Sequence, residues 1–201
     1  KVACVNGLGM GTKAVVIVDV RAVRCGECSA TREAVGAHRY HRDMEMHEAT
    51  TTARDASEYV PRIAAFLADI GLAVEWGDVP DDAFLPGVLV IRNGLRIDRA
   101  RLRYPSDLLH EAGHLAGLTA GERDQSPPVV GTDAGLEMMA LAWSYAAAVA
   151  IGVPAEVLFH TDGYKGWGPS LAENFRAGRY VGVPMLQYHG LACEPRQTME
   201  R

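Results

Sequence analysis

The sequence predicts an α+β fold in which a small antiparallel sheet packs on a long apolar helix, and a second core helix follows. Three observations predict this order. Apolar residues recur at helical spacing over residues 53–71, two extended runs meet at Asn93-Gly94, and further apolar helical segments begin near Ser106 and Thr132. A chain of 201 residues that is 48% hydrophobic is long enough to bury one core.

The first predicted helix covers residues 53–71. Its apolar side chains recur at mixed three- and four-residue intervals, so one face of the helix is apolar. They are Val60, Ile63, Ala64, Phe66, Leu67 and Ile70. Gly71 is typical of the residue that ends a helix. The short run AVEW, residues 73–76, then predicts a strand.

Residues 87–98, GVLVIRNGLRID, predict a β-hairpin. Two extended runs flank Asn93-Gly94, and this dipeptide favours a type I′ turn, in which both central residues have positive φ. The chain therefore reaches the next helix after a small sheet.

That next helix carries the motif HEAGH. We expect it to begin near Ser106 and to end before Gly121. His110 and His114 are four residues apart and project from the same side, so both imidazoles can reach one tetrahedral ion at about 2.0–2.1 Å. Glu111 lies beside them, where it can contact the attacking water rather than the metal, which is the general-base position.

The same spacing also occurs by chance in ordinary helices, so the context of the motif matters. The segment is largely apolar, through Leu108, Leu109, Ala112, Leu115 and Ala116. Two histidines and a glutamate in such a helix are costly to bury without a partner, and a metal ion supplies one. The motif therefore predicts a zinc site.

A catalytic zinc usually has three protein ligands, so a third is needed. A longer zinc motif would require a histidine at position 120, where this chain has Ala120. Glu137 is the single acid in the body of the following helix, which Thr132 and Asp133 are expected to cap. We expect Glu137 to be the third ligand, and the alternative is that it only favours the positive end of the helix dipole.

The segment FHTDGYKGWGPS, residues 159–170, predicts a loop rich in glycine and aromatic residues. Either His160 or Tyr164 is placed to donate a hydrogen bond to an oxyanion. His160 is also a competitor for the third ligand position, or a packed core residue.

Two other motifs are weaker. The stretch Gly7–Lys13, GLGMGTK, lacks the spacing of a phosphate-binding loop. Cys25 and Cys28 with His38 and His41 offer four metal ligands, but both spacings are shorter than those of a zinc finger. We assign neither a nucleotide site nor a structural zinc to this region.

Composition narrows the choice of partners and location. The net charge of −5 is unlike that of a general nucleic-acid binder. Four scattered cysteines are too few for a disulfide scaffold and favour a reducing, cytoplasmic location. The apolar run 138–155 is weakly hydrophobic because Ala and Gly dominate it, so we expect a core helix rather than a membrane span.

The charge balance also changes along the chain. Residues 1–45 hold seven Lys or Arg against five Asp or Glu and show little periodicity, whereas the remainder is acidic. We expect residues 1–45 to be an extension, disordered or outside the native domain, residues 53–190 to form a zincin-like metal-binding domain, and residues 191–201 to be a tail.

The sequence resembles the IrrE/ImmA-like group of minimal gluzincins, which are HExxH zincin metallopeptidases. The resemblance rests on YPSDLLHEAGHLAG, on Glu137 in the next helix and on the small-residue run ALAWSYAAA, and it covers residues 53–190. It implies a minimal zincin fold in which His110, His114 and Glu137 bind Zn²⁺ and Glu111 is the catalytic acid and base. No helix-turn-helix segment accompanies the motif, so no regulatory role is carried over.

These observations predict a zinc-dependent hydrolase acting on a peptide or protein substrate. The alternative is a non-catalytic zinc-binding module with a regulatory or structural role. Glu111 favours the enzyme, because a purely structural zinc site is closed by a fourth protein ligand. Nothing in the sequence indicates the oligomeric state.

Overall fold

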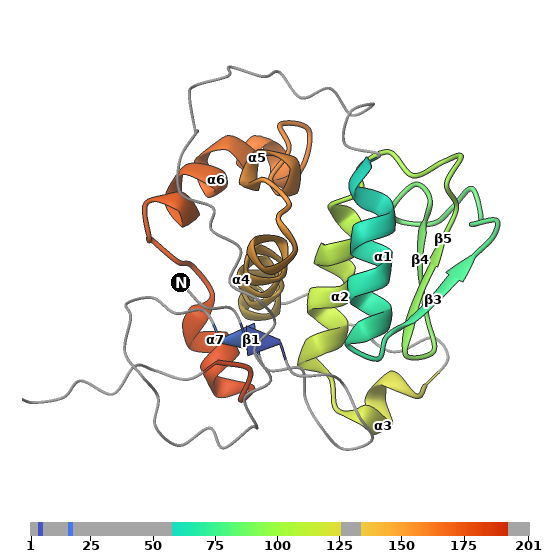
Figure 1. The fold of residues 1–201 in the computed structure, drawn as a ribbon, viewed down its shortest axis with the longest axis horizontal. Coiled ribbons are helices and arrows are strands. Elements are labelled where there is room, and N and C mark those ends of the chain that lie inside the picture. The colour runs from blue at the N-terminus through green and yellow to red at the C-terminus, as the bar shows by residue number, and fades with distance from the viewer. Residues whose placement is uncertain (1–3, 6–15, 18–57, 126–133, 193–201) are drawn as a thin grey trace, which may run out of the picture.

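The computed structural model describes residues 4–5, 16–17, 58–125 and 134–192, and it confirms the α+β class. A three-stranded sheet lies at one side of the molecule, α1 and α2 lie next to it, and α4 follows beyond them (Figure 1). The helices after α4 cover its far side (Figure 1). The core therefore sits around α2 and α4, which contact each other along their length.

Helix α1, Tyr59–Asp69, buries the apolar face that its spacing predicts. Gly71 follows with φ of 87°, a left-handed conformation that stops the helix, and the Leu72 N–H donates to the Leu67 carbonyl oxygen at 2.9 Å. The predicted start of this helix at residue 53 lies outside the described residues.

The sheet contains β3 (Ala73–Trp76), β4 (Val88–Ile91) and β5 (Gly94–Ile97) in the order β3-β5-β4. The β4–β5 pair is the expected antiparallel hairpin, but β3 pairs in parallel with β5, so the sheet is mixed rather than antiparallel. The reason is topological. Strands β3 and β4 lie at opposite edges of the sheet, and the hairpin places β5 between them, where it runs antiparallel to β4 and parallel to β3.

The hairpin turn differs from the predicted type I′. Ile91 pairs with Gly94, so the two turn residues are Arg92 and Asn93, and of these only Asn93 has positive φ, at 50°. Gly94 is needed for another reason. A Cβ on it would lie 2.0 Å from the Ala73 carbonyl oxygen, so only glycine allows β3 to approach this closely.

Helix α2, Asp107–Gly117, ends three residues earlier than expected, because Leu118 is extended. Thr119 then begins the short helix α3, Ala120–Arg123, through a capping box with Glu122. The predicted cap residue Ser106 precedes α2 but makes no side-chain capping bond. Gly121 therefore belongs to α3 and does not end α2.

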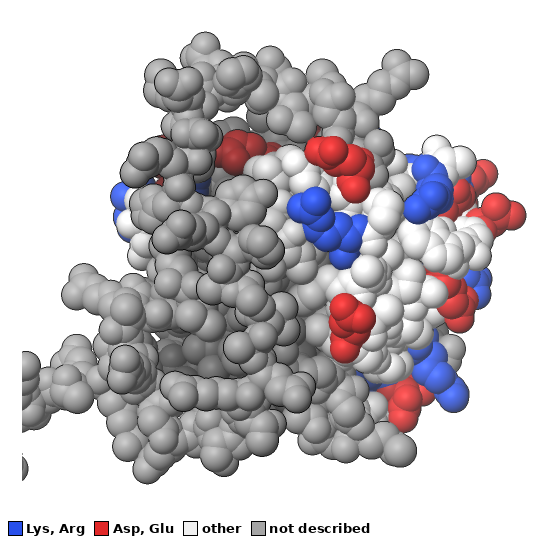
Figure 2. Space-filling model, in the orientation of Figure 1, with Lys and Arg blue, Asp and Glu red and all other residues white. Residues whose placement is uncertain are grey.

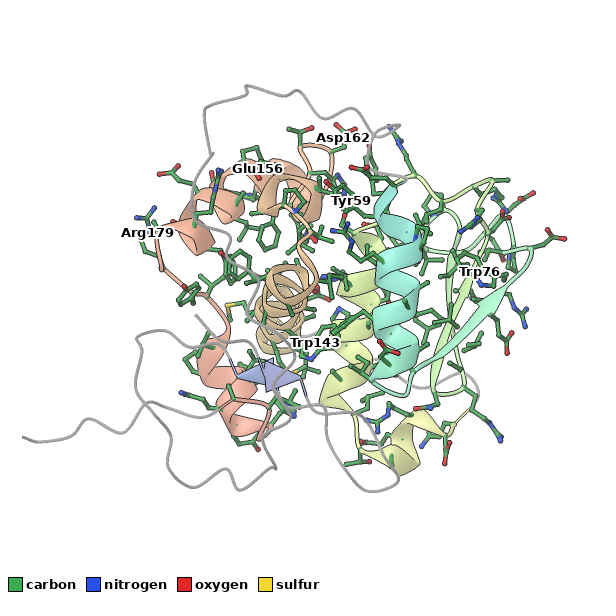
Figure 3. All side chains as sticks on the ribbon, in the orientation of Figure 1. Tyr59, Trp76, Trp143, Glu156, Asp162 and Arg179 are labelled. Atoms are coloured by element: carbon green, nitrogen blue, oxygen red, sulfur yellow. The ribbon has the colours of Figure 1, made fainter. Side chains whose placement is uncertain are left out.

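Helix α4, Ala134–Ile151, is apolar along most of its length. Its length and composition would allow it to cross a membrane, but a buried core helix meets the same criterion. Its Trp143 is fully buried and lies 6.1 Å, between ring centroids, from Phe66 of α1 (Figure 3). The proposed cap residues Thr132 and Asp133 lie outside the described residues.

The chain then forms α5 (Ala155–Leu158), a 3₁₀ turn (Tyr164–Gly166), α6 (Gly168–Arg176) and α7 (Val183–Tyr188). Stacked and tilted aromatic rings join this region to α4: Tyr145, Phe159, Phe175 and Tyr180. These contacts hold the segment that contains His160 and Tyr164 against the core.

In the N-terminal region the structure describes β1 (Cys4–Val5) and β2 (Val16–Ile17), which pair antiparallel and contact α4. The remainder of the expected extension 1–45 lies outside the described residues. The same holds for the glycine-rich stretch 7–13, for the Cys25, Cys28, His38 and His41 group, and for the tail from residue 193.

Charged side chains of both signs are interspersed on the described surface visible in Figure 2. Several of them form exposed ion pairs, such as Arg96 with Glu75 at 2.8 Å. Exposed pairs of this kind contribute little to stability.

Candidate metal centre

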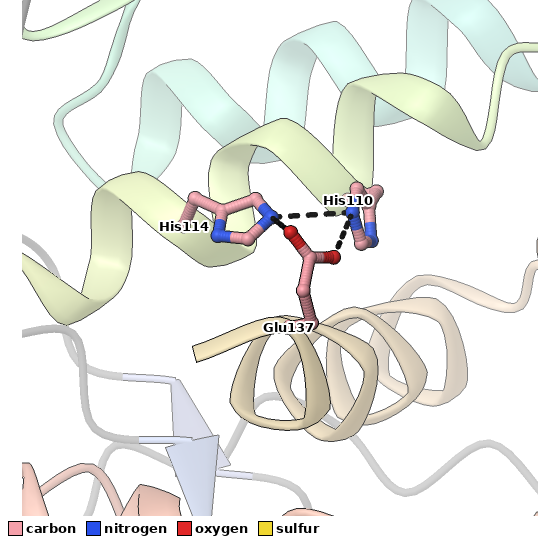
Figure 4. A group of neighbouring side chains, drawn as sticks. All are labelled: His110, His114 and Glu137. Atoms are coloured by element: carbon pink, nitrogen blue, oxygen red, sulfur yellow. Dashed lines mark hydrogen bonds and ion pairs between the residues drawn. The ribbon is translucent and has the colours of Figure 1, made fainter. Parts of the chain in front are cut away.

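Two packed helices bring together the three residues proposed as metal ligands. His110 and His114 lie on consecutive turns of α2, and Glu137 lies in the first turn of α4 (Figure 4). The carboxylate of Glu137 points at both imidazoles (Figure 4). Among the described residues, these three form a group whose side chains could hold a metal ion. One donor atom from each residue lies within 4.8 Å of the other two.

The donors of the three side chains lie close enough together to share one ion, and each histidine faces a different oxygen of Glu137. The Nε2 atoms of His110 and His114 are 3.2 Å apart, and Glu137 oxygens lie 3.4 Å and 3.5 Å from them. Ligands at about 2.0–2.1 Å from a tetrahedral zinc are separated by about 3.3–3.4 Å along each edge. The histidine–carboxylate distances also exceed those of ordinary N–H···O bonds, so Glu137 faces both imidazoles without a direct hydrogen bond to either.

The two histidines have the protonation state that metal binding needs. Burial, assisted by the neighbouring His114, lowers the pKa of His110 to about 4. Burial also lowers the pKa of His114, although the charge of Glu137 opposes this. Both rings are therefore neutral near pH 7, and a neutral imidazole has one ring nitrogen with a lone pair for a metal.

The candidate site is buried at His114 and partly exposed to solvent at Glu137. The side chain of His114 is 6% exposed, whereas that of Glu137 is 43% exposed. With three protein donors, a tetrahedral ion keeps a fourth position for water or substrate. Nδ1 of His110 is buried and finds no hydrogen-bond partner among the described residues.

Glu111 lies on α2 between the two histidines and outside the three-residue ligand group. Burial raises its pKa to about 7, and the carboxylates of Asp107 and Glu137 add to the shift. A carboxylate with a pKa near the working pH can both accept and return a proton. The metal-free chain therefore places a suitable base beside the proposed ligands.

His160 lies next to the site but not in the ligand group. Its Nε2 is 3.5 Å from an Asp107 carboxylate oxygen, and its ring stacks on Tyr104 with centroids 3.7 Å apart. Of the two candidates for the third ligand, Glu137 is thus the one that faces His110 and His114. His160 instead joins the beginning of α2 to the loop after α5.

Tyr164 is closer to the proposed ligands. Its ring stands edge-on to His110 with centroids 5.8 Å apart, and its hydroxyl donates to the Leu158 carbonyl oxygen over a long 3.4 Å. Burial, followed by the charges of Asp107 and Glu111, raises its pKa above the ordinary value, so the hydroxyl keeps its proton. Tyr164 is therefore a hydrogen-bond donor whose present partner is held weakly.

Two features of the site were missed by sequence reasoning. Asp107 lies three and four residues before His110 and Glu111, so it shares their side of α2, and this spacing is a signal the sequence contains. Tyr164 and Lys165 both have positive φ, at 55° and 56°. Such strain at non-glycine residues often marks functional sites, but no sequence pattern shows it.

In comparisons with known proteins, no family model, no curated protein and no solved structure matches this chain.

Replacing Glu137 with alanine is expected to weaken zinc binding strongly, because two histidines alone leave the ion without its third protein donor and without a compensating charge. The measurement is the zinc dissociation constant by competition with a chelator. Glu173→Ala, which removes a carboxylate on α6 that is 77% exposed, is the control and should bind zinc as the wild type does. Full zinc affinity in Glu137→Ala would move the third ligand elsewhere, with His160 the next candidate.

Proposed function

We propose that this protein is a zinc-dependent hydrolase, and that its substrates are peptides or proteins. The observation that carries the proposal is the convergence of the His110, His114 and Glu137 donors, which lie within 4.8 Å of one another, with Glu111 beside them. A site built from two histidines and one glutamate, with a free fourth position, is typical of catalytic rather than structural zinc.

A zinc ion held by these residues supplies Lewis-acid chemistry, which activates water and stabilises negative charge on a carbonyl oxygen. Glu111 accepts the proton of the attacking water and passes it to the leaving amine. The hydroxyl of Tyr164 donates a hydrogen bond to the oxygen that gains charge in the tetrahedral intermediate, in exchange for its long contact with Leu158.

The resemblance to IrrE/ImmA-like minimal gluzincins supports the choice of peptide bonds. It rests on residues 104–117 and on Glu137, and in that group the corresponding residues hold zinc and provide the catalytic glutamate. We place the activity in the cytoplasm, in line with the four scattered cysteines.

The proposal is tested on the purified protein by measuring zinc per chain and cleavage of a broad peptide library. We expect about one zinc per chain and cleavage that stops when a chelator removes the metal and returns when zinc is restored. Cleavage that persists in the stripped protein would contradict the proposal.

One observation favours a non-catalytic alternative. The three donors come from α2 and α4, the two helices that form the centre of the core. A bound ion would therefore also cross-link these helices and stabilise the fold. A structural clamp predicts no hydrolysis of any peptide and a large fall in melting temperature when zinc is chelated. The enzyme predicts cleavage in the same preparation.

Replacing Tyr164 with phenylalanine is expected to weaken the binding of acetohydroxamate to the zinc-loaded protein by about 10- to 150-fold. The probe places a charged oxygen at the metal, and a hydrogen bond to a charged group is worth about 1.5–3 kcal/mol. The measurement is a binding titration, with Tyr188→Phe, at a side chain that is 83% exposed, as the control. Equal affinity in the wild type and Tyr164→Phe would remove Tyr164 from the site.

A further inference from the structure

The position of Glu137 depends on how α4 lies against α2, because the two histidines and the glutamate come from different helices. A displacement of α4 relative to α2 would change the distances between the Glu137 carboxylate and the two imidazoles. The residues that fix the two helices relative to each other therefore influence the metal centre without touching an ion.

Gly113 sets the distance between the helices. It lies directly before His114 on α2, and its backbone approaches Ala140 of α4. A Cβ at this position would lie 2.9 Å from the carbonyl oxygen and 3.0 Å from the Cα of Ala140. These are backbone atoms, so a side chain on Gly113 can be accommodated only if the helices move apart.

Ser144 fixes how far one helix slides along the other. Its side chain is fully buried, and its hydroxyl oxygen lies 3.0 Å from the Leu109 carbonyl oxygen of α2 and 2.6 Å from the Ala140 carbonyl oxygen of α4. Leu109 directly precedes His110. The single hydroxyl proton is shared between these two acceptors, one on each helix, at the level of the first proposed ligand.

The two contacts are arranged around the metal centre. Glu137, Ala140 and Ser144 follow one another at three- and four-residue spacing and share one side of α4, while Gly113 and Leu109 are four residues apart on α2. Each proposed ligand histidine therefore has an interhelical contact at the preceding residue. The contact at Gly113 limits separation, and the contact at Ser144 limits sliding.

We propose that Gly113 and Ser144 are positioning residues that hold Glu137 in register with His110 and His114, and so determine the affinity of the site for a tetrahedral ion. This inference rests on the proposed metal site and goes beyond it, since neither residue contacts a ligand atom of the cluster. Loss of an outer-shell partner typically costs about 10- to 100-fold in metal affinity.

The test compares Gly113→Ala and Ser144→Ala with wild type in two measurements: the zinc dissociation constant by chelator competition, and the melting temperature of the zinc-free protein. We expect zinc affinity to fall by about 10- to 100-fold in both variants. Alanine has a higher helix propensity than glycine, which offsets part of any loss of stability in Gly113→Ala. Ser144→Ala adds no atom, so it remains informative if Gly113→Ala does not fold.

Ile63→Val is the matched control, because Ile63 is fully buried on α1 and lies outside the α2–α4 contact. It is expected to lower the melting temperature and leave the zinc dissociation constant unchanged. A dissociation constant for Ser144→Ala equal to that of the wild type would overturn the inference, and so would an equal loss of affinity in Ile63→Val. A wild type that binds no zinc would instead overturn the proposed metal site itself.

Discussion

Glu111→Gln is expected to keep its zinc and its fold while peptide hydrolysis falls by about 10²- to 10⁴-fold, the usual contribution of a positioned proton-transfer group. Glutamine has nearly the same shape as glutamate but cannot accept the proton of the attacking water. Glu111 is not one of the three residues whose donors converge, so the metal content should not change. The measurements are zinc per chain and the initial rate of cleavage of a peptide that the wild type hydrolyses.

The control for this substitution is Glu156→Gln, which alters a half-exposed carboxylate paired with Arg176 on the surface and should leave the rate unchanged. Equal rates for wild type and Glu111→Gln would contradict the assigned mechanism even with zinc bound. Loss of zinc together with activity would show that Glu111 acts on the metal instead of the water.

His114→Ala is expected to abolish stoichiometric zinc binding, and His110→Ala is expected to do the same. Each removes one of only three protein donors, so the cost should exceed the roughly 10- to 100-fold that loss of an outer-shell partner causes. Zinc per chain after dialysis against a weak chelator measures the effect, and circular dichroism shows whether the fold survives. His189→Ala, on a histidine that follows α7, is the control and should retain zinc.

A His114→Ala protein that stays folded and keeps one zinc per chain would place the ion elsewhere. The four cysteines and remaining histidines would then be the residues to examine.

The helices could be predicted because their signals are local. The apolar spacing in α1 and the HEAGH motif in α2 depend on neighbouring turns only, and the structure reproduces both elements. Glu137 could be selected for a similar reason, since it is the single acid in an apolar helix. The end of α2 was placed too late because Gly121 was taken as its stop, although Thr119 and Glu122 already form the signature of a new helix.

The sheet order and the packing around the site could not be predicted, because they depend on contacts between distant segments. The parallel pairing of β3 with β5 brings Gly94 close to Ala73, a contact that a single sequence does not reveal. The same is true of the contact between Gly113 and Ala140. The edge-on contact of Tyr164 with His110 also depends on two consecutive positive φ angles at residues that rarely adopt them.

The central claim is that His110, His114 and Glu137 bind one tetrahedral zinc ion, and X-ray absorption of the zinc-loaded protein tests it most directly. We expect a first shell of nitrogen and oxygen at about 2.0–2.1 Å, with the outer scattering of two imidazole rings. A sulfur shell at about 2.3 Å would contradict the account, because it would place the zinc on cysteine and leave the HEAGH helix without its metal.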